Sequence, residues 1–542
     1  MLLSAAPGVM LAAVVALLVA VCVVLPSPPP LRHLLLRAAL LRASGWQRRR
    51  LELQSTDVRH GQERRLRRLL PPGAAPGEPD GERGQRAAGA AGRPSEPRRP
   101  PGGSDAFRER HPPSPCCDDG ERAEPLPPLS LWAVLRSCWS AEPALQGLLL
   151  YLHALHRTFP QALTLRGTAL LGWAPTAPRA PGFCPLPTLY CTPPEAAALP
   201  LRSAALRVQL LFALRTRSLR VLEARLPNEL HDALVALRDG WAELAHDLAL
   251  GTLSPQPGLP EEMRGRLQAL LVPDGTRAAE LRAECERGFE GIVRRLWPQL
   301  QVVVVGTVRG GERLYCDALP WAACEGLPLY CPWYRVAGEW AFCEFLPCPV
   351  DEKEEQHTAL LGELWEGREY TLILTARPGE YRCRAGEVLR VAGFHKQCPV
   401  VEPVRRESQV LSVRGESIPE EQFCRSLHRA VGMWPGARLM DYICVESTLL
   451  GAGAPHYEVF VELWGLRDLS EEQRHKLDHC LQEDFPIYKL FRFKGSIGPL
   501  RLHLVGAGAF TRLREAMGCP VPMPRVLREE RLLAVIQGTV IS

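Results

Sequence analysis

The 542-residue chain lacks the patterns that a metal site or a nucleic-acid-binding surface requires. None of its 18 cysteines belongs to a CxxC pair, so we expect no zinc site and mostly small buried thiols. The 65 basic and 60 acidic side chains leave a formal net charge of only +5, which is too small to indicate nucleic acid as a partner. No spacing of serine, histidine and aspartate supports a hydrolytic triad. These absences exclude several common function classes.

Basic side chains are also missing ahead of Arg32, whereas a cleaved signal peptide usually begins with a positive charge. Residues 5–25 form an uncharged apolar run, and a membrane-spanning helix needs about 20 residues. The arginines that follow this run favour a cytosolic main domain. We therefore expect residues 1–26 to be an uncleaved signal-anchor in the endoplasmic reticulum membrane or nuclear envelope. The alternative is a cleaved signal peptide followed by a lumenal domain.

Residues 27–125 offer little material for a core of their own. Arg32–Arg68 mixes leucines with arginines and indicates a basic juxtamembrane helix, which either lies on an anionic membrane surface or packs on the main domain. The Pro-, Arg- and Gly-rich tract that follows has almost nothing to bury. Its single aromatic residue, Phe107, gives little support to base stacking. We expect this tract to be a disordered linker.

Residues 126–403 alternate helix and strand patterns. Asn228 predicts the N-cap of an apolar-faced helix that ends at Gly251. Gln301–Val305 and Thr371–Ala376 have the composition of buried strands. This alternation predicts a large layered α/β domain.

Residues 404–542 predict a small α+β cap domain. Two capping boxes, Ser417 with Glu420 and Ser470 with Gln473, each indicate the start of a helix. The order of elements, α-β-β-α-β, indicates an antiparallel sheet belonging to this domain. Its strands are expected at 438–449, 457–464 and 500–504.

Three sequence blocks resemble one family when they are taken together. They are FEGIVRRLWPQLQVVVV (289–305), YTLILTARPGEYRCRAGEVLRVAGFHKQCP (370–399) and YKLFRFKGSIGPLRL (488–502). All three are similar, in order and spacing, to blocks of the auxin-responsive Gretchen Hagen 3 acyl-amido synthetases. The resemblance implies an adenylate-forming fold with ATP and Mg as cofactors. It also implies a carboxylic acid and an amino acid as substrates.

The resemblance assigns candidate site residues. Tyr381, Arg384 and Glu387 correspond to a turn in which the family places an aspartate on the nucleotide ribose. A glutamate keeps the two acceptor oxygens but moves them by about 1.5 Å, and misplacement of about 1 Å is costly in a site. Arg405 lies where the two domains are expected to meet. Lys494 matches a basic position that faces the phosphates, where a cation stabilises departing pyrophosphate.

Two further family elements are altered in this sequence. No loop rich in glycine and hydroxyl side chains precedes the helix expected at Ala144–Arg157, and the glycines of 302–311 follow a structural strand. Gly338 occupies the position of the family's acid near the metal, and Glu339 comes one residue later. We therefore expect an acyl-amido synthetase-like protein with impaired catalysis. The alternatives are a non-catalytic, membrane-tethered scaffold that binds a nucleotide or a protein partner, and a basic adaptor for a membrane surface or RNA that uses 32–99.

Overall fold

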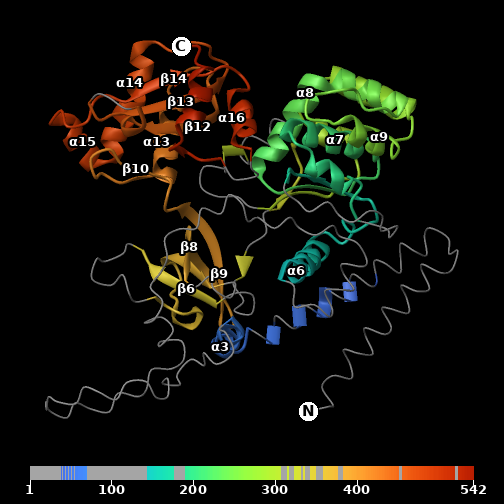
Figure 1. Cartoon of the computed structure of the whole chain (residues 1–542), viewed down its shortest axis with the longest axis horizontal. Coiled ribbons are helices and arrows are strands. Elements are labelled where there is room, and N and C mark those ends of the chain that lie inside the picture. The colour runs from blue at the N-terminus through green and yellow to red at the C-terminus, as the bar shows by residue number, and fades with distance from the viewer. Residues whose placement is uncertain are drawn as a thin grey trace. The chain divides into compact units, whose positions relative to one another are not determined.

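The computed structural model describes most of residues 38–69, together with 143–175, 189–306, 314–315, 323–330, 334–335, 342–348, 358–375, 382–450, 454–518 and 523–542. The chain divides into two compact units. Unit 1 takes in Met1–Arg48, Asp119–Pro332 and Ser408–Ser542, and unit 2 takes in Arg49–Asp118 and Trp333–Glu407. Parallel, antiparallel and mixed sheets occur together with helices, so the fold is mixed α/β (Figure 1).

The N-terminal part of unit 1 is built on a parallel sheet with the strand order β1-β2-β3-β4. Every residue of β2 and β3 is buried, as expected for strands that are covered on both faces. The strand predicted at Gln301–Val305 is therefore confirmed. The four strands are β1 (Thr168–Leu171), β2 (Val221–Ala224), β3 (Val302–Val305) and β4 (Leu329–Tyr330).

Helices cover both faces of this sheet. Leu222 and Val303 point into a large core that includes α7, α8 and α10, whereas Val221 and Val302 point into a smaller core that includes α6. The side chains of successive strand residues alternate between these cores because they point to opposite faces. The helices are α6 (Pro143–Thr158), η2 (Pro194–Ala198), α7 (Arg202–Arg215), α8 (Pro227–Leu250), α9 (Glu261–Gln268), α10 (Gly275–Glu286) and α11 (Ile292–Leu296).

Helix α8 begins differently from the prediction. Leu226 is its N-cap residue, and Glu229 Oε2 accepts a hydrogen bond from the Leu226 backbone N–H at 3.1 Å. Asn228 lies inside the first turn, where its side-chain oxygen accepts from Arg202 Nη2 at 2.9 Å. The predicted N-cap is therefore wrong, because the Asn228 side chain bonds to the buried Arg202 inside the first turn instead of capping the helix. The predicted end is confirmed, since Gly251 has the left-handed φ of 66°.

The C-terminal part of unit 1 is a mixed sheet with the order β14-β13-β12-β15. Strands β12 and β13 are antiparallel, but β14 and β15 join them in parallel, so the expectation of an antiparallel sheet is wrong. One face packs on α13, α14 and α15, and the other on α16 and α17 (Figure 1). The strands are β10 (Val410–Leu411), β11 (Ile418–Pro419), β12 (Arg438–Glu446), β13 (Tyr457–Trp464), β14 (Arg501–Leu504) and β15 (Val526–Leu527); the helices are α13 (Glu420–Gly432), η5 (Ser447–Leu450), α14 (Glu471–Asp484), α15 (Pro486–Phe493), α16 (Ala509–Met517) and α17 (Glu530–Gln537).

One of the two predicted capping boxes is present. Ser470 Oγ accepts from the Gln473 backbone N–H at 3.3 Å, and Gln473 Oε1 accepts from the Ser470 N–H at 2.8 Å. The box predicted at Ser417 is wrong, because the two residues after it form β11 and α13 starts only at Glu420, after an N-cap at Pro419.

These two serines give a matched stability test. Ser470→Ala is expected to lower the free energy of unfolding by about 1 kcal/mol, the usual cost of losing an N-cap oxygen. Ser417→Ala is expected to change it by only a few tenths, because Ser417 is exposed and caps no helix. Chemical denaturation of both variants measures the difference. Equal effects would contradict the assignment of the box.

Unit 2 is an antiparallel sheet with the order β5-β9-β8-β7-β6. The strand predicted at Thr371–Ala376 corresponds to β7, which begins earlier, at Glu369, and ends at Thr375. The core of the unit lies between the sheet, η4 and α3. The elements are α3 (Val58–Leu69), β5 (Tyr334–Arg335), β6 (Phe342–Pro347), η4 (Leu361–Glu363), β7 (Glu369–Thr375), β8 (Cys383–His395) and β9 (Cys398–Arg406).

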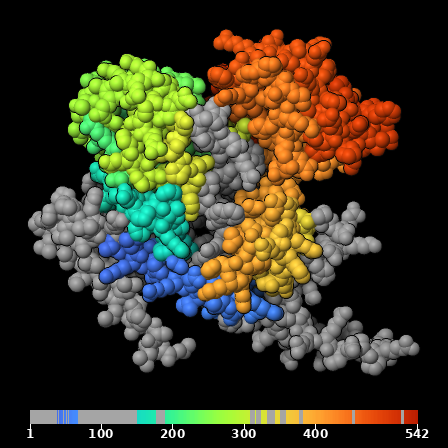
Figure 2. All heavy atoms as spheres, turned by 180° about the vertical axis from the view of Figure 1, so that it is seen from behind, coloured from blue at the N-terminus to red at the C-terminus, as the bar shows by residue number. Residues whose placement is uncertain are grey.

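Helix α3 belongs to the stretch for which two locations stayed open, the membrane surface and the main domain. Val58 and Leu66 are buried, and Gln62 Nε2 donates to the Cys343 backbone oxygen of β6 at 2.8 Å. Just before the helix, Glu52 contacts His395 Nε2 at 2.9 Å and Lys396 Nζ at 3.2 Å. The blue α3 segment lies against the gold strands of the sheet in Figure 2. The described part from Glu52 onward therefore packs on the sheet of unit 2, which is part of the main domain in the earlier alternative.

The other N-terminal predictions concern residues that the structure does not describe. The signal-anchor of 5–25 and most of the linker before residue 125 lie outside the described residues. Within the described ranges, no helix combines the length and the apolarity needed to cross a membrane. The cysteines of those ranges are free thiols without disulfides.

Candidate functional site

The stretch predicted as a nucleotide-binding turn is part of one long strand. Residues Cys383–His395 form β8 without interruption, and the chain reverses after it at Lys396, which has a φ of 56°. Gly386 has a φ of 68° and lies in a bulge, where residues 385–387 stand opposite one residue of β7. Within β8, glycine thus supplies a bulge that leaves the sheet continuous, whereas the part of the predicted turn before Arg382 lies outside the described residues and stays a prediction. Tyr381 lies outside the described residues.

Glu387 is the last residue of the bulge, and its side chain is half-buried. Its partner across the sheet is Arg406 of β9, and directly opposed residues share a face of the sheet. Arg384 precedes the bulge, is also half-buried and stands opposite Ile373. The structure thus pairs Glu387 with an arginine adjacent to the one that the sequence singled out.

Arg405 takes part in an ion-pair network across the middle of the sheet. Its guanidinium and Arg390 Nη2 both donate to the Glu369 carboxylate, the latter at 2.9 Å, and Arg390 also contacts Glu402 at 3.2 Å. Partial burial acts to raise the pKa of Glu369, but the hydrogen bonds from Arg390 and Arg405 hold it below the ordinary value. Arg405 therefore ties β9 to β7.

A buried polar cluster anchors the start of β8. Glu344 of β6 accepts from Arg382 Nε at 2.9 Å and from Thr358 Oγ1 at 2.6 Å. Arg382 has a left-handed φ of 52°, and its backbone N–H donates to Thr375 Oγ1 at 2.9 Å. All four side chains are buried. Sequence reasoning missed Glu344, although it is the single acid in the otherwise apolar strand FCEFLP.

Lys494 lies in unit 1, at the C-cap of α15, with an exposed side chain. Its neighbour Arg492 is held by Asp478, with Nη2 and Oδ2 3.0 Å apart. Burial acts to raise the pKa of Asp478, but the hydrogen bonds from Arg492 and Tyr488 lower it below the ordinary value. Arg492 is thus a structural cation, which leaves Lys494 accessible to a ligand. Glu339 lies outside the described residues.

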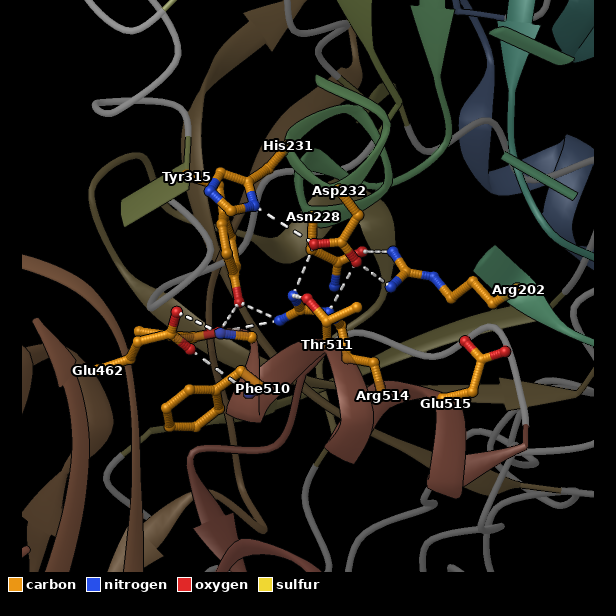
Figure 3. Close-up of polar contacts among 12 residues, drawn as sticks. Arg202, Asn228, His231, Asp232, Tyr315, Glu462, Phe510, Thr511, Arg514 and Glu515 are labelled. Carbon is orange, nitrogen blue, oxygen red and sulfur yellow. Dashed lines mark hydrogen bonds and ion pairs between the residues drawn. The ribbon is translucent and has the colours of Figure 1, made fainter. Parts of the chain in front are cut away.

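A second charged cluster lies inside unit 1, between its N-terminal and C-terminal parts (Figure 3). Arg514 of α16 holds Asp232 of α8 with two hydrogen bonds, Nε to Oδ2 at 3.0 Å and Nη2 to Oδ1 at 2.6 Å. Its third nitrogen, Nη1, donates to the Tyr315 hydroxyl and to Asp441 Oδ2 of β12, both at 2.9 Å. We call this group the Arg514 cluster; its members are Arg202, Asp232, Tyr315, Asp441, Arg514 and Arg525.

The charges of the Arg514 cluster compensate one another. Arg202 pairs with Asp232, and Arg525 pairs with Asp441. Burial acts to raise the pKa of Asp232, but the guanidiniums of Arg514 and Arg202 hold it well below the ordinary value. Burial also acts to lower the pKa of Arg514, which Asp232 and Asp441 keep above its ordinary value. Both charged forms therefore persist in the interior.

Metal binding requires a different arrangement. Within the described ranges, no group of three or more His, Cys, Asp or Glu side chains could hold a metal ion.

Comparisons with known proteins place this fold in a family. Models of the GH3 family match in chain order: the N-terminal domain over residues 176–329, the central domain over 334–406 and the C-terminal domain over 421–520. A GH3 domain-containing protein of Homo sapiens is 39% identical over 94% of both chains. One from Mus musculus is 40% identical over 74% of this chain and 77% of its own. The chain therefore belongs to the GH3 family.

Plant members and a solved structure extend the comparison. An indole-3-acetic acid-amido synthetase of Oryza sativa subsp. indica is 30% identical over 52% of each chain. The solved structure of the GH3.15 acyl acid amido synthetase has a TM-score of 0.62 and 21% identity, over 73% of this chain and 79% of its own. At that identity the structural likeness concerns the fold.

Proposed function

We propose that the protein binds Mg-ATP and is an acyl-amido synthetase-like protein whose activation of a carboxylic acid is impaired. The observation that carries the proposal is the half-buried carboxylate of Glu387 on β8, at the position where the family holds the ribose. A carboxylate offers the two acceptors that a pair of ribose hydroxyls requires. The plant relatives, named as amido synthetases, support ligase chemistry with a carboxylic acid and an amino acid as substrates.

The chain's own residues fit a nucleotide in two further respects. Arg384 is half-buried on the same strand as Glu387. Lys494 of unit 1, exposed at the C-cap of α15, is the proposed phosphate cation by its resemblance to the family's basic position. ATP carries the magnesium ion largely on its phosphates, so a full protein cage is unnecessary. The impaired activity is inferred from Gly338 in place of an acid and from the missing phosphate loop, both of which weaken stabilisation of the transferring phosphates.

Mg-ATP binding to the full chain tests the proposal. Glu387→Ala is expected to weaken binding at least 10-fold, because hydrogen bonds to a charged group contribute about 1.5–3 kcal/mol each. Glu387→Asp restores the family's acid and is expected to bind at least as tightly as the parent. Glu366→Ala removes an exposed acid of the same unit and serves as the control. Calorimetry gives all four dissociation constants.

The outcomes separate the two halves of the proposal. Absence of Mg-ATP binding by the parent would overturn the nucleotide assignment. Equal binding by parent and Glu387→Ala would move the nucleotide away from β8. Pyrophosphate exchange with a panel of carboxylic acids then tests impairment, and rates equal to those of a plant synthetase would contradict it.

A further inference from the structure

The Arg514 cluster joins two stretches of chain that are far apart in sequence. Asp232 belongs to α8 in the N-terminal part of unit 1, whereas Arg514 belongs to α16 in the C-terminal part, 282 residues away. A second contact lies beside it: Glu515 accepts from the Ser203 backbone N–H at 3.3 Å and from its hydroxyl at 3.1 Å. The cluster therefore lies at the seam between these two parts.

Charges alternate in sign through this seam. The order is Arg202, Asp232, Arg514, Asp441 and Arg525, and each side chain is at most 6% exposed. Arg514 stands in the middle: it bonds to Asp232 of the N-terminal part (Figure 3) and to Asp441 of the C-terminal part. Removing it leaves each aspartate with an arginine from its own part of unit 1, so the direct pairing of charges across the seam is lost.

Tyr315 reinforces the seam from the N-terminal side. Its hydroxyl bonds to Asp441 and to Arg514, and its ring lies 5.5 Å from the ring of His231, centroid to centroid. The neighbouring Leu314 is buried in the core of the C-terminal part. This short segment, which precedes the second stretch of unit 2 in the sequence, is therefore held by the same cluster.

Helix α16 is itself fixed to the C-terminal sheet. Glu462 of β13 accepts from the Gly508 and Phe510 backbone N–H groups at the start of α16, at 2.9 and 3.5 Å. Asp441 on β12 holds Arg514 near its end. The guanidinium thus has a defined place relative to the sheet. Its bidentate contact with Asp232 fixes the position of α8 relative to the guanidinium, since bidentate pairs fix direction as well as distance.

We propose that Arg514 is a positioning residue that seats the C-terminal part of unit 1, and Lys494 with it, on the N-terminal part. The functional meaning of this seat rests on the proposed ligase-like function, because Lys494 acts there as the phosphate cation. A buried ion pair is weak evidence for net stability, and in some proteins such groups fix one arrangement instead, which is the role proposed for Arg514. The contacts of Arg514 fix the position of one part of unit 1 on the other. Weakening them therefore lets the two parts move relative to each other without unfolding either core.

Hydrogen exchange of the full chain tests the positioning role. Arg514→Met is expected to speed exchange at least 10-fold in two segments only, residues 227–235 of α8 and 509–517 of α16. Strands β3 and β13 lie within the two cores and keep their parental rates. Arg514→Lys retains the charge without the fork and is expected to give an intermediate effect. Arg512→Met, on the exposed side of α16, is the matched control.

Two results would overturn the proposal. One is exchange in both segments that matches that of Arg512→Met. The other is a uniform rise that includes β3 and β13, which would make Arg514 a plain stability residue. Mg-ATP affinity of Arg514→Met is measured in parallel and is expected to fall, because the loosened seat no longer fixes Lys494, the proposed phosphate cation. A parent that fails to bind Mg-ATP would refute the proposed function, while the exchange result still decides the role of Arg514.

Discussion

Replacing Glu344 by alanine is expected to destabilise unit 2 by about 3–5 kcal/mol, because it removes the acidic partner of the buried Arg382 guanidinium. The Glu344 and Arg382 side chains are 1% and 3% exposed, and their ion pair is 2.9 Å long. The Thr358 hydroxyl, which accepts from Arg382 Nη2 at 3.4 Å, is neutral and cannot balance the guanidinium charge in place of the carboxylate. Thermal unfolding and hydrogen exchange of β6, β7 and β8 measure the loss.

Two further variants make this result specific. Glu402→Ala breaks a pair with Arg390 whose side chains are 28% and 41% exposed, and it is expected to cost less than about 1 kcal/mol. The double variant Glu344→Leu with Arg382→Met removes both charges and is expected to recover most of the lost stability. A Glu344→Ala protein that unfolds at the parental temperature would refute the structural role of this pair.

Replacing Glu223 by glutamine is expected to stabilise the protein at pH 8 by up to about 3 kcal/mol. Glu223 lies on β2, 7% exposed, with the hydroxyls of Tyr151 and Tyr190 at 3.3 and 3.2 Å. Burial raises its pKa from 4.5 to about 7, against the lowering effect of these hydrogen bonds. Glutamine keeps a carbonyl oxygen for the hydroxyls but carries no charge to desolvate.

The pH dependence follows from the direction of that shift. A carboxyl whose folded pKa lies above its unfolded value favours folding while it is protonated, so its contribution is full below about pH 4.5 and declines as the pH rises to about 7. The advantage of Glu223→Gln is therefore expected to vanish at pH 4.5 and to reach its maximum above pH 7. Denaturation at both pH values measures it, with the exposed Glu286→Gln as the control. A pH-independent difference would show that Glu223 is not the titrating group.

Local chemistry explains which elements the sequence predicted correctly. The four valines of β3, the end of α8 at Gly251 and the capping box at Ser470 each depend on a few adjacent residues. Predictions failed where a distant partner decides the outcome. Asn228 was expected as a cap, but Arg202 occupies its oxygen.

The candidate site shows the same division. Glu387 could be named because a resemblance covers its whole block, but its bulge depends on the pairing of β8 with β7 and β9. The Arg514 cluster left no signal in the sequence, since its members are single residues far apart along the chain. Only the folded chain brings Asp232 to Arg514.

The packing of α3 on unit 2 changes how the N-terminal stretch should be regarded. Val58 packs into the core of the central sheet, Leu66 is buried as well, and Glu52 holds the end of the β8–β9 hairpin. A shortened protein that starts after the linker would expose this apolar surface to water and leave the hairpin tip unsupported. The residues from Glu52 to the end of α3 are thus a structural part of unit 2 that covers its central sheet. Such a truncation is therefore expected to promote aggregation.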